Sequence, residues 1–396
     1  MAFKTTNPVL STRALGRATL ARQLLLAPAA MSAEDAVSHL LGLQAQNTKP
    51  PYYALAARLD GFRPEHLSAV MESRRVARIV TMRSTIHTHT AADVFTLRPL
   101  VQPARSREIG IFRKGLVGVD LDRLAALARE LVEERPRTPK EIREALLVEW
   151  PDADPQSLGV AARCLLPLVQ VTPRGLWRRS GQVCLTTAET WFGRRAAAAP
   201  GEAVSADAAR PAPADPGPAA APAAAVLDDT VLRYLAAFGP ASVKDMQIWC
   251  GLTRLREAFE RLRPGLVTFQ DEHGVELFDL PDAPRPDEDT PAPPRFLPEF
   301  DNLLLSHADR SRVVAAEARN RTWKGNQAYC VFLLDGQLAG LWRLEETKER
   351  TTMTVQPFGR TTKAQRAELE EEARRMLGVM AQPGVPYEVG FGIVDE

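Results

Sequence analysis

The feature that most constrains this chain is a pattern of three helix-like segments followed by a β-ribbon, which occurs three times. The first copy predicts helices over 14–26 and 32–44 and a third helix starting near Pro64. A β-branched stretch over 76–89 then predicts a hairpin that turns near Arg83 and Ser84. This order of elements is that of a winged helix.

The second and third copies have the same order of elements. The expected segments of the second are helices over 120–133, 138–150 and 156–166 and a ribbon over 169–185; those of the third are helices over 227–238, 242–250 and from Thr253, and a ribbon over 266–278. Three such units in tandem are a more specific signal than any one of them.

The remaining segments complete an α+β fold with five parts. An Ala/Pro-rich stretch predicts a dispensable flexible linker, and alternating apolar residues near the end predict a β-rich C-terminal region. The expected parts are a first winged-helix unit at 1–119, a second at 120–195, the linker at 196–226, a third winged-helix unit at 227–294 and the β-rich region at 295–396.

Composition narrows the class of protein without identifying it. No apolar run approaches the roughly 18 residues of a membrane span, so we expect a cytoplasmic protein with no membrane partner. The four cysteines lie far apart with no C-x-x-C pair, which favours buried free thiols over a zinc site or disulfides. The net charge of +1 favours no partner, so charge in local patches must decide.

Two glutamines follow the second predicted helix. Gln44 continues the apolar stripe of Val37 and Leu40, where a carboxamide needs hydrogen-bond partners. If the helix ends near Ala45, as the following prolines favour, the side chains of Gln44 and Gln46 can point the same way. The pattern therefore predicts either two converging functional carboxamides or two structural glutamines that cap a helix end.

The first ribbon carries two histidines and several cations. His87 and His89 lie on one side of a strand. Three interpretations are open: a metal pair, for which no third ligand lies nearby, a nucleic-acid contact, or a packed pair. Arg78, Arg83 and Thr85 share this ribbon. Basic clusters on ribbons are typical of duplex binders, although any single cluster is more often an ordinary solvated face.

Two further clusters combine charge with aromatic or polar residues. The second ribbon carries Arg174, Trp177, Arg178 and Arg179. A polar stretch over 299–312 brackets three leucines, and its acidic residues Asp301 and Asp309 are interpreted as partners of Arg310 or Arg312 in a structural network. No phosphate-binding glycine loop, nucleophile elbow or kinase signature is present.

Taken in order, four of these motifs resemble the AlkZ/YcaQ family of bacterial DNA glycosylases. The motifs are Gly42-Leu43-Gln44-Ala45-Gln46, Thr81-Met82-Arg83-Ser84-Thr85-Ile86-His87, Pro173-Arg174-Gly175-Leu176-Trp177 and Leu297-Pro298-Glu299-Phe300-Asp301-Asn302 with Asp309-Arg310-Ser311-Arg312. The resemblance covers nearly the whole chain. The only mild departure is Arg83-Ser84-Thr85 where the family usually has Arg-Gly-Thr.

The resemblance implies a function and a set of site residues. Gln44 and Gln46 would be catalytic, in the Gln/Gln version that resembles the branch linked to self-resistance against DNA-alkylating natural products such as azinomycin B. The partner would be double-stranded DNA carrying N7-alkylguanine adducts or crosslinks, bound by a nucleoid-associated monomer without metal or cofactor. The implied DNA-binding residues are Arg78, Arg83, Thr85, His87, His89, Arg174, Trp177, Arg178, Arg179, Asp301, Asn302, Arg310 and Arg312.

The chemistry of such a reaction suits neutral amides. An N7-alkylguanine is cationic and therefore already a good leaving group, so a carboxamide that positions water suffices in place of a strong base. Lys49 is the nearest amine, and nothing indicates that it is desolvated enough to form a Schiff base. The sequence thus predicts a monofunctional glycosylase, with a non-catalytic winged-helix regulator or a lesion-sequestering protein as the alternatives.

Overall fold

The computed structural model describes residues 7–193, 223–325 and 327–393. Most of the expected linker, 196–222, lies outside these residues. Its last residues, 223–226, instead begin helix α11 (Ala223–Phe238), four residues earlier than expected. Among the described residues, no helix is both long enough and apolar enough to cross a membrane.

The first unit has the three predicted helices, of which the first two end earlier than expected, a helix that Thr90 caps as its sequence favours, and two additional helices. Its helices are α1 (Thr12–Arg22), α2 (Ala33–His39), α3 (Pro50–Ala56), α4 (Pro64–Glu72), α5 (Ala91–Leu100) and α6 (Gln102–Ile111). The helix expected over 32–44 ends at His39, because Leu41 and Gly42 adopt positive φ angles of 54° and 90°. A Cβ on Gly42 would lie 2.3 Å from the His89 ring, so only glycine fits this turn.

The first two ribbons join into one antiparallel sheet. Its order is β1-β3-β2-β4-β5. The strands are β1 (Leu43–Gln44), β2 (Val76–Val80), β3 (Ile86–Thr90), β4 (Leu168–Gln170) and β5 (Leu185–Thr187). The turn between β2 and β3 is the 3₁₀ segment η1 (Met82–Ser84), where the hairpin was predicted to turn. The glutamine motif therefore begins on an edge strand rather than at a helix end.

The second and third units also show the predicted order of elements. Their helices are α7 (Leu121–Glu134), α8 (Pro139–Glu149), α9 (Pro155–Leu165), α10 (Ala188–Phe192), α11, α12 (Val243–Cys250) and α13 (Arg256–Leu262). The third ribbon is the separate hairpin of β6 (Val267–Gln270) and β7 (Glu276–Asp279). The side chains of Thr138 and Ser242 form the capping boxes of α8 and α12, which is why these helices begin where they do.

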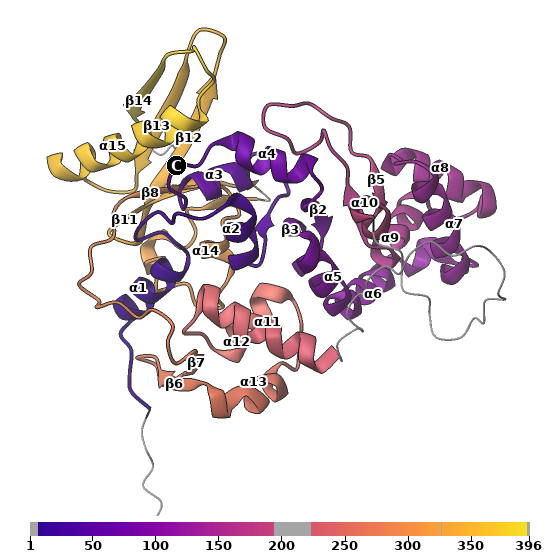
Figure 1. Ribbon diagram of the computed structural model, residues 1–396, viewed down its shortest axis with the longest axis horizontal. Helices are drawn as coiled ribbons and strands as arrows, with labels where there is room; N and C mark the ends of the chain where they lie inside the picture. Colours follow the sequence, from indigo (N-terminus) through magenta and orange to yellow (C-terminus); the bar gives the residue numbers. More distant parts are fainter. Residues whose placement is uncertain (1–6, 194–222, 326, 394–396) are drawn as a thin grey trace, which may run out of the picture.

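The C-terminal region is rich in β-structure and packs on the first unit (Figure 1). Its main sheet has the order β14-β13-β12-β11-β8. Its elements are β8 (Arg295–Leu297), α14 (Asn302–Leu305), β9 (Trp323–Lys324), β10 (Gln327–Ala328), β11 (Cys330–Leu334), β12 (Gln337–Glu346), β13 (Thr351–Pro357), α15 (Lys363–Met380) and β14 (Tyr387–Phe391). Buried residues of α15 and this sheet share one apolar core with α3 and α4.

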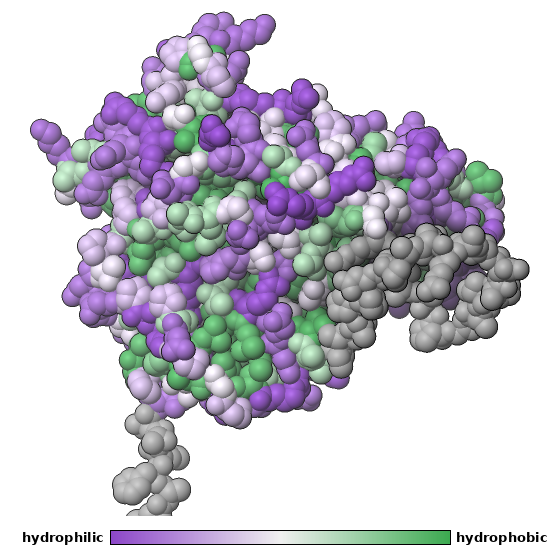
Figure 2. Space-filling view, in the orientation of Figure 1, coloured by the Kyte–Doolittle hydropathy of each residue, from purple (hydrophilic) through white to green (hydrophobic). Residues whose placement is uncertain are grey.

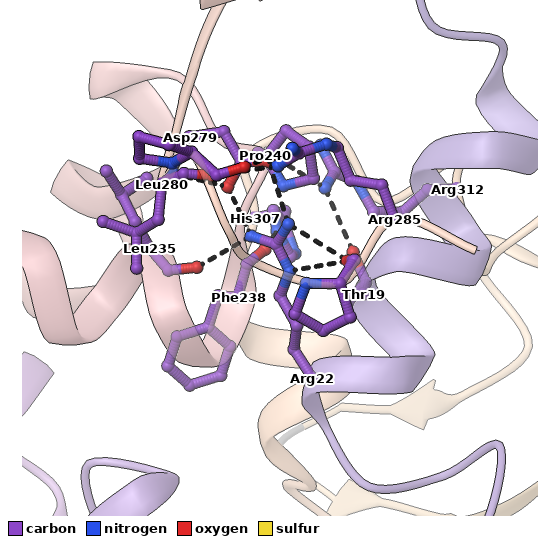
Figure 3. Close-up of polar contacts among 12 residues, drawn as sticks. Thr19, Arg22, Leu235, Phe238, Pro240, Asp279, Leu280, Arg285, His307 and Arg312 are labelled. Atoms are coloured by element: carbon purple, nitrogen blue, oxygen red, sulfur yellow. Dashed lines mark hydrogen bonds and ion pairs between the residues drawn. The ribbon is translucent and has the colours of Figure 1, made fainter. Parts of the chain in front are cut away.

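A buried polar network connects α1 to the third unit (Figure 3). Arg22 donates two hydrogen bonds to the Asp279 carboxylate, at 2.5 and 2.8 Å, and neither side chain is exposed. Arg285 also pairs with Asp279 at 2.6 Å. Because a buried ion pair is costly to break, this network fixes the third unit against the first.

The surface is mainly hydrophilic on the face shown in Figure 2. Hydrophobic residues gather toward the bottom of that view, where α11, α12 and α13 lie.

Candidate active site

Gln44 lies at the end of β1 and is fixed by an arginine. Its side chain is 7% exposed, and its Oε1 accepts a hydrogen bond from Arg83 Nη2 at 2.9 Å. A guanidinium only donates, so this bond sets which side of the amide is oxygen. The Nε2 group of Gln44 is therefore left to donate elsewhere.

Gln46 is the exposed partner of Gln44. Gln46 follows β1 in a bend, and the side chains of both glutamines bond to the β2–β3 hairpin, Gln44 to Arg83 and Gln46 to the start of β3. The backbone N–H of Ala45 donates to Ile86 O at 2.7 Å, which continues the pairing past β1. Gln46 Oε1 accepts only a long hydrogen bond, 3.3 Å, from the Ile86 N–H.

Arg83 connects the first unit to the third at this site. It lies in η1 with a φ of 52°, and its Nη1 donates to the carbonyl of Trp249 in the last turn of α12. Burial lowers the pKa of Arg83 to about 10, so it remains charged at neutral pH. No carboxylate of the described residues pairs with it; the carbonyl end of α12 supplies the negative charge instead.

Arg78 contacts the backbone of the glutamine motif and is not a surface residue. Its side chain is buried, and its Nη2 donates to the carbonyl of Ala45 at 2.6 Å while Nη1 donates to Gln170 Oε1 at 2.6 Å. Burial, with a smaller effect from Arg174, lowers its pKa to about 10. Strands β1 and β4 cover the guanidinium of Arg78, and this burial argues against the DNA contact expected for it.

His87 and His89 are also buried rather than aimed at DNA. Their rings stack with centroids 5.5 Å apart. His87 Nδ1 donates to the Thr85 carbonyl at 3.1 Å, and His89 Nε2 shares a hydrogen bond of 2.9 Å with the Thr81 hydroxyl. Burial lowers the pKa of His87 well below its usual value and that of His89 to about 4, so both are neutral. The packed pair is the interpretation that their positions support.

Asp301 and Asn302 hold the backbone on which the motif rests. Asp301 forms a bidentate pair with Arg58 at 2.7 and 2.9 Å, both side chains being buried. Asn302 Nδ2 donates to the carbonyls of Leu40 and Gly42 at 3.2 and 2.8 Å. Asn302 therefore fixes the turn between α2 and β1, and the burial of both residues argues against the DNA contact expected for them.

The expected pairing of Asp301 and Asp309 with Arg310 or Arg312 is also wrong. Asp309 accepts hydrogen bonds from the Ser311 backbone and hydroxyl, at 3.0 and 2.8 Å. Arg312 is buried and donates to Thr19 Oγ1 and the Pro240 carbonyl, which argues against the DNA contact expected for it. Arg310 is exposed and bonds only the Leu304 carbonyl, at 3.4 Å.

The loop between β4 and β5 carries the second group of expected basic residues, of which Arg178 shares Glu346 with Lys49. Trp177 packs on Tyr52 at a centroid distance of 4.9 Å, which anchors the loop. Arg178 pairs with Glu346 at 2.7 Å, and Arg179 is exposed. Arg174 is half-buried and donates to the Gly181 carbonyl at 3.1 Å.

The remaining expectations concern Thr85 and a metal site. Thr85 is half-buried, and its hydroxyl donates to the Met82 carbonyl at 3.1 Å. The described residues contain no group of three or more His, Cys, Asp or Glu side chains arranged to hold a metal ion.

Some residues of this site were not predicted. Arg58 pairs with Asp301, Trp249 supplies the carbonyl to Arg83, and Glu299 Oε1 accepts from Asn47 Nδ2 at 2.7 Å. Of these residues, only Trp249 had a sequence signal: Gly251 predicts the end of α12, and Trp249 lies in the last turn, where backbone carbonyls are free to accept. The other two partnerships join residues more than 240 positions apart.

Comparison with known proteins identifies the family. The family model "DNA glycosylase AlkZ-like" matches residues 37–379, which is most of the chain. The chain belongs to the AlkZ-like DNA glycosylase family. Among solved structures, it is similar to the Streptomyces sahachiroi DNA glycosylase AlkZ, with a TM-score of 0.72 and 18% sequence identity. That match covers 96% of this chain and 100% of the other, and at this identity it shows a shared fold.

No curated protein matches in the sequence search. Membership of the AlkZ-like family confirms the resemblance inferred from the four motifs, and it makes DNA repair by a glycosylase the function class of the chain.

Proposed function

We propose that this AlkZ-like protein hydrolyses the N-glycosidic bond of N7-alkylated purines in double-stranded DNA, including the unhooking of interstrand crosslinks. Two neighbouring carboxamides at the end of an edge strand carry this proposal, since Gln46 is exposed and Gln44 is fixed by a charged arginine. No metal or cofactor takes part in the chemistry proposed.

The two glutamines have different roles in this scheme. Gln46 is exposed and its oxygen receives only one long hydrogen bond, so Gln46 orients the attacking water toward C1′. Arg83 already donates to the oxygen of Gln44, so Gln44 acts in this scheme as a hydrogen-bond donor through its Nε2 group. As the cationic base departs as a neutral purine, the water adds to C1′ and its proton passes to solvent.

The reaction ends at an abasic site without strand cleavage. Lys49 lies three residues after Gln46, and its ammonium pairs with Glu346 at 2.6 Å while remaining exposed. A Schiff base needs a neutral, desolvated amine, which this environment does not favour. We therefore propose a monofunctional enzyme.

Bulky lesions suit this arrangement. Gln46 and Asn47 are exposed at the sheet edge, so a reacting nucleotide need not enter an enclosed pocket. Full extrusion of a base is difficult when it is covalently joined to the opposite strand. An open site can act on such a crosslink, and we propose a monomer that binds one duplex there.

The proposal is tested by incubating the protein with a duplex that carries one N7-alkylguanine and scoring abasic sites by alkaline cleavage. Cleavage only after alkali, and only at the lesion, is the expected result. Tight lesion binding without abasic sites would indicate a sequestering protein instead. Equal binding to undamaged DNA without abasic sites would indicate a regulator.

A further inference from the structure

A cavity of about 520 Å³ begins one residue beyond Gln46. One wall is the segment Asn47, Thr48, Lys49 and Pro50. The facing wall comes from the C-terminal region, through Pro298, Glu299 and residues of β10, β11 and β12. The first unit and the C-terminal region thus build most of this cavity, with Arg174 from the β4–β5 loop, next to the catalytic motif but separate from it.

Two buried polar atoms on the cavity residues have no hydrogen-bond partner. Tyr53 is 5% exposed, and its hydroxyl is unpartnered; so is Nε of Arg174. Burial, together with Glu346, Cys330 and other neighbours, raises the pKa of Tyr53, so its hydroxyl keeps its proton. Tyr53 lines the cavity together with Glu346 and Cys330, and its hydroxyl is buried in the cavity wall.

The cavity pairs apolar surfaces with unused donors. Tyr53 and Trp342 lie 5.4 Å apart between ring centroids, and Pro50, Pro298 and Leu344 add apolar surface. Tyr53 Oη and Arg174 Nε each carry a hydrogen that no atom of the described residues accepts. A buried donor without an acceptor is unfavourable, so a matching ligand supplies oxygen acceptors beside a flat apolar group.

We propose that this cavity binds the alkyl substituent of the lesion, and that the substituent it fits is an aromatic group bearing a carbonyl or ester oxygen. The inference rests on the proposed function, because it assigns the base to Gln44 and Gln46 and the substituent to the space beyond Asn47. Volumes of this size are typical of small-molecule sites. The enzyme would then discriminate lesions by what is attached at N7.

The test compares affinity for two lesions and does not depend on turnover. Both duplexes carry a 2′-fluoro sugar, which resists hydrolysis because fluorine disfavours positive charge at C1′. One has N7-methylguanine and the other an N7-(2-oxo-2-arylethyl)guanine. The variants are Tyr53→Phe, which removes only the unpartnered hydroxyl, and Ala328→Phe, which fills the cavity from β10.

Tyr52→Phe is a matched control. The Tyr52 hydroxyl donates to the Gly175 carbonyl at 2.7 Å and does not line the cavity, so its loss should lower the melting temperature without changing lesion preference. Tyr53→Phe should keep or raise the melting temperature and weaken binding of the aryl lesion about fivefold. Ala328→Phe should weaken it by about tenfold or more, while N7-methylguanine binding stays unchanged in both variants.

Two results would overturn the inference. Equal losses for both lesions would show that the cavity takes the base or the DNA backbone, and unchanged affinity for both would show that it takes no part in binding. Failure of the proposed function is distinguishable: the parent protein would then leave no abasic site in an N7-alkylguanine duplex with an ordinary sugar, whatever Tyr53→Phe does to binding.

Discussion

At the scale of single residues, the site depends on a charged arginine that no carboxylate of the described residues pairs with. Arg83 donates to Gln44 on one side and to the Trp249 carbonyl on the other. That carbonyl lies at the C-terminal end of α12, where the helix dipole favours a cation. Arg83 therefore acts through Gln44, as a positioning residue, and does not need to touch the substrate.

Arg83→Lys should slow single-turnover excision by about tenfold or more, because a lysine cannot bridge both oxygens. DNA affinity should hardly change. Since Arg83 acts through Gln44, adding Gln44→Ala to Arg83→Lys should reduce the rate little further. Fully additive losses in this double-mutant cycle would show that the two side chains act independently.

The stacked histidines give the protein a dependence on pH. Their pKa values are lowered in the fold, that of His89 to about 4, so the unfolded chain binds protons first as the pH falls. The stability they contribute is complete above about pH 6.5 and is lost as the pH falls toward 4. In chemical denaturation, the unfolding free energy of a His87→Gln, His89→Gln double variant should fall less steeply across this pH range than that of the parent. An unchanged slope would assign the effect to His307, whose pKa is also lowered, to about 3.

At the scale of elements, the turn between α2 and β1 sets the position of the motif. The sequence placed Gln44 on a helix because the spacing from Val37 and Leu40 is helical. The observed turn depends on Gly42 beside the His89 ring, and β3 is far from Gly42 in sequence. Helices with local signals, such as the Thr138 and Ser242 capping boxes, were predictable.

The roles of buried side chains were less predictable than the elements. His87 and His89 alternate correctly for a strand, but their burial follows from β1 and β2 flanking β3, which is long-range pairing. The sequence predicted that Arg78 is part of a basic surface, whereas its side chain is buried in the structure. The glutamine motif itself was found through the family resemblance, since spacing alone left a structural explanation open.

Asn302→Asp tests the turn with a side chain of nearly the same shape that cannot donate. The carbonyls of Leu40 and Gly42 would lose their partner, which should cost about 1–3 kcal/mol of unfolding free energy. Excision per folded molecule should also slow, because β1 would shift. A stable variant with full activity would show that the turn keeps its conformation without the Asn302 hydrogen bonds.

At the scale of the whole molecule, many of the arginines are already neutralised. In the third unit, Arg256, Arg261 and Arg263 pair with Glu260, Glu276 or Asp228. Exposed arginines without a paired carboxylate among the described residues include Arg179 in the β4–β5 loop and Arg107 on α6, a helix next to η1. We therefore expect the duplex to lie along the first and second units.

Arg179→Ala should weaken binding to any duplex and reduce the salt dependence, the slope of log K against log salt, by about 0.9. Arg261→Ala is the matched control, since its guanidinium already pairs with Asp228 and should contribute little. The measurement is a titration at several salt concentrations. Equal effects of the two variants would contradict the proposed duplex path.

The central claim is that Gln44 and Gln46 carry the chemistry, and single-turnover excision of an N7-alkylguanine beside a melting curve tests it most directly. Each alanine variant should lose about tenfold or more in rate, or ~1.4 kcal/mol of transition-state stabilisation. Gln46→Ala should melt like the parent because Gln46 is exposed, whereas Gln44→Ala should melt lower because Arg83 Nη2 loses its acceptor. Full excision rates in both folded variants would contradict the account.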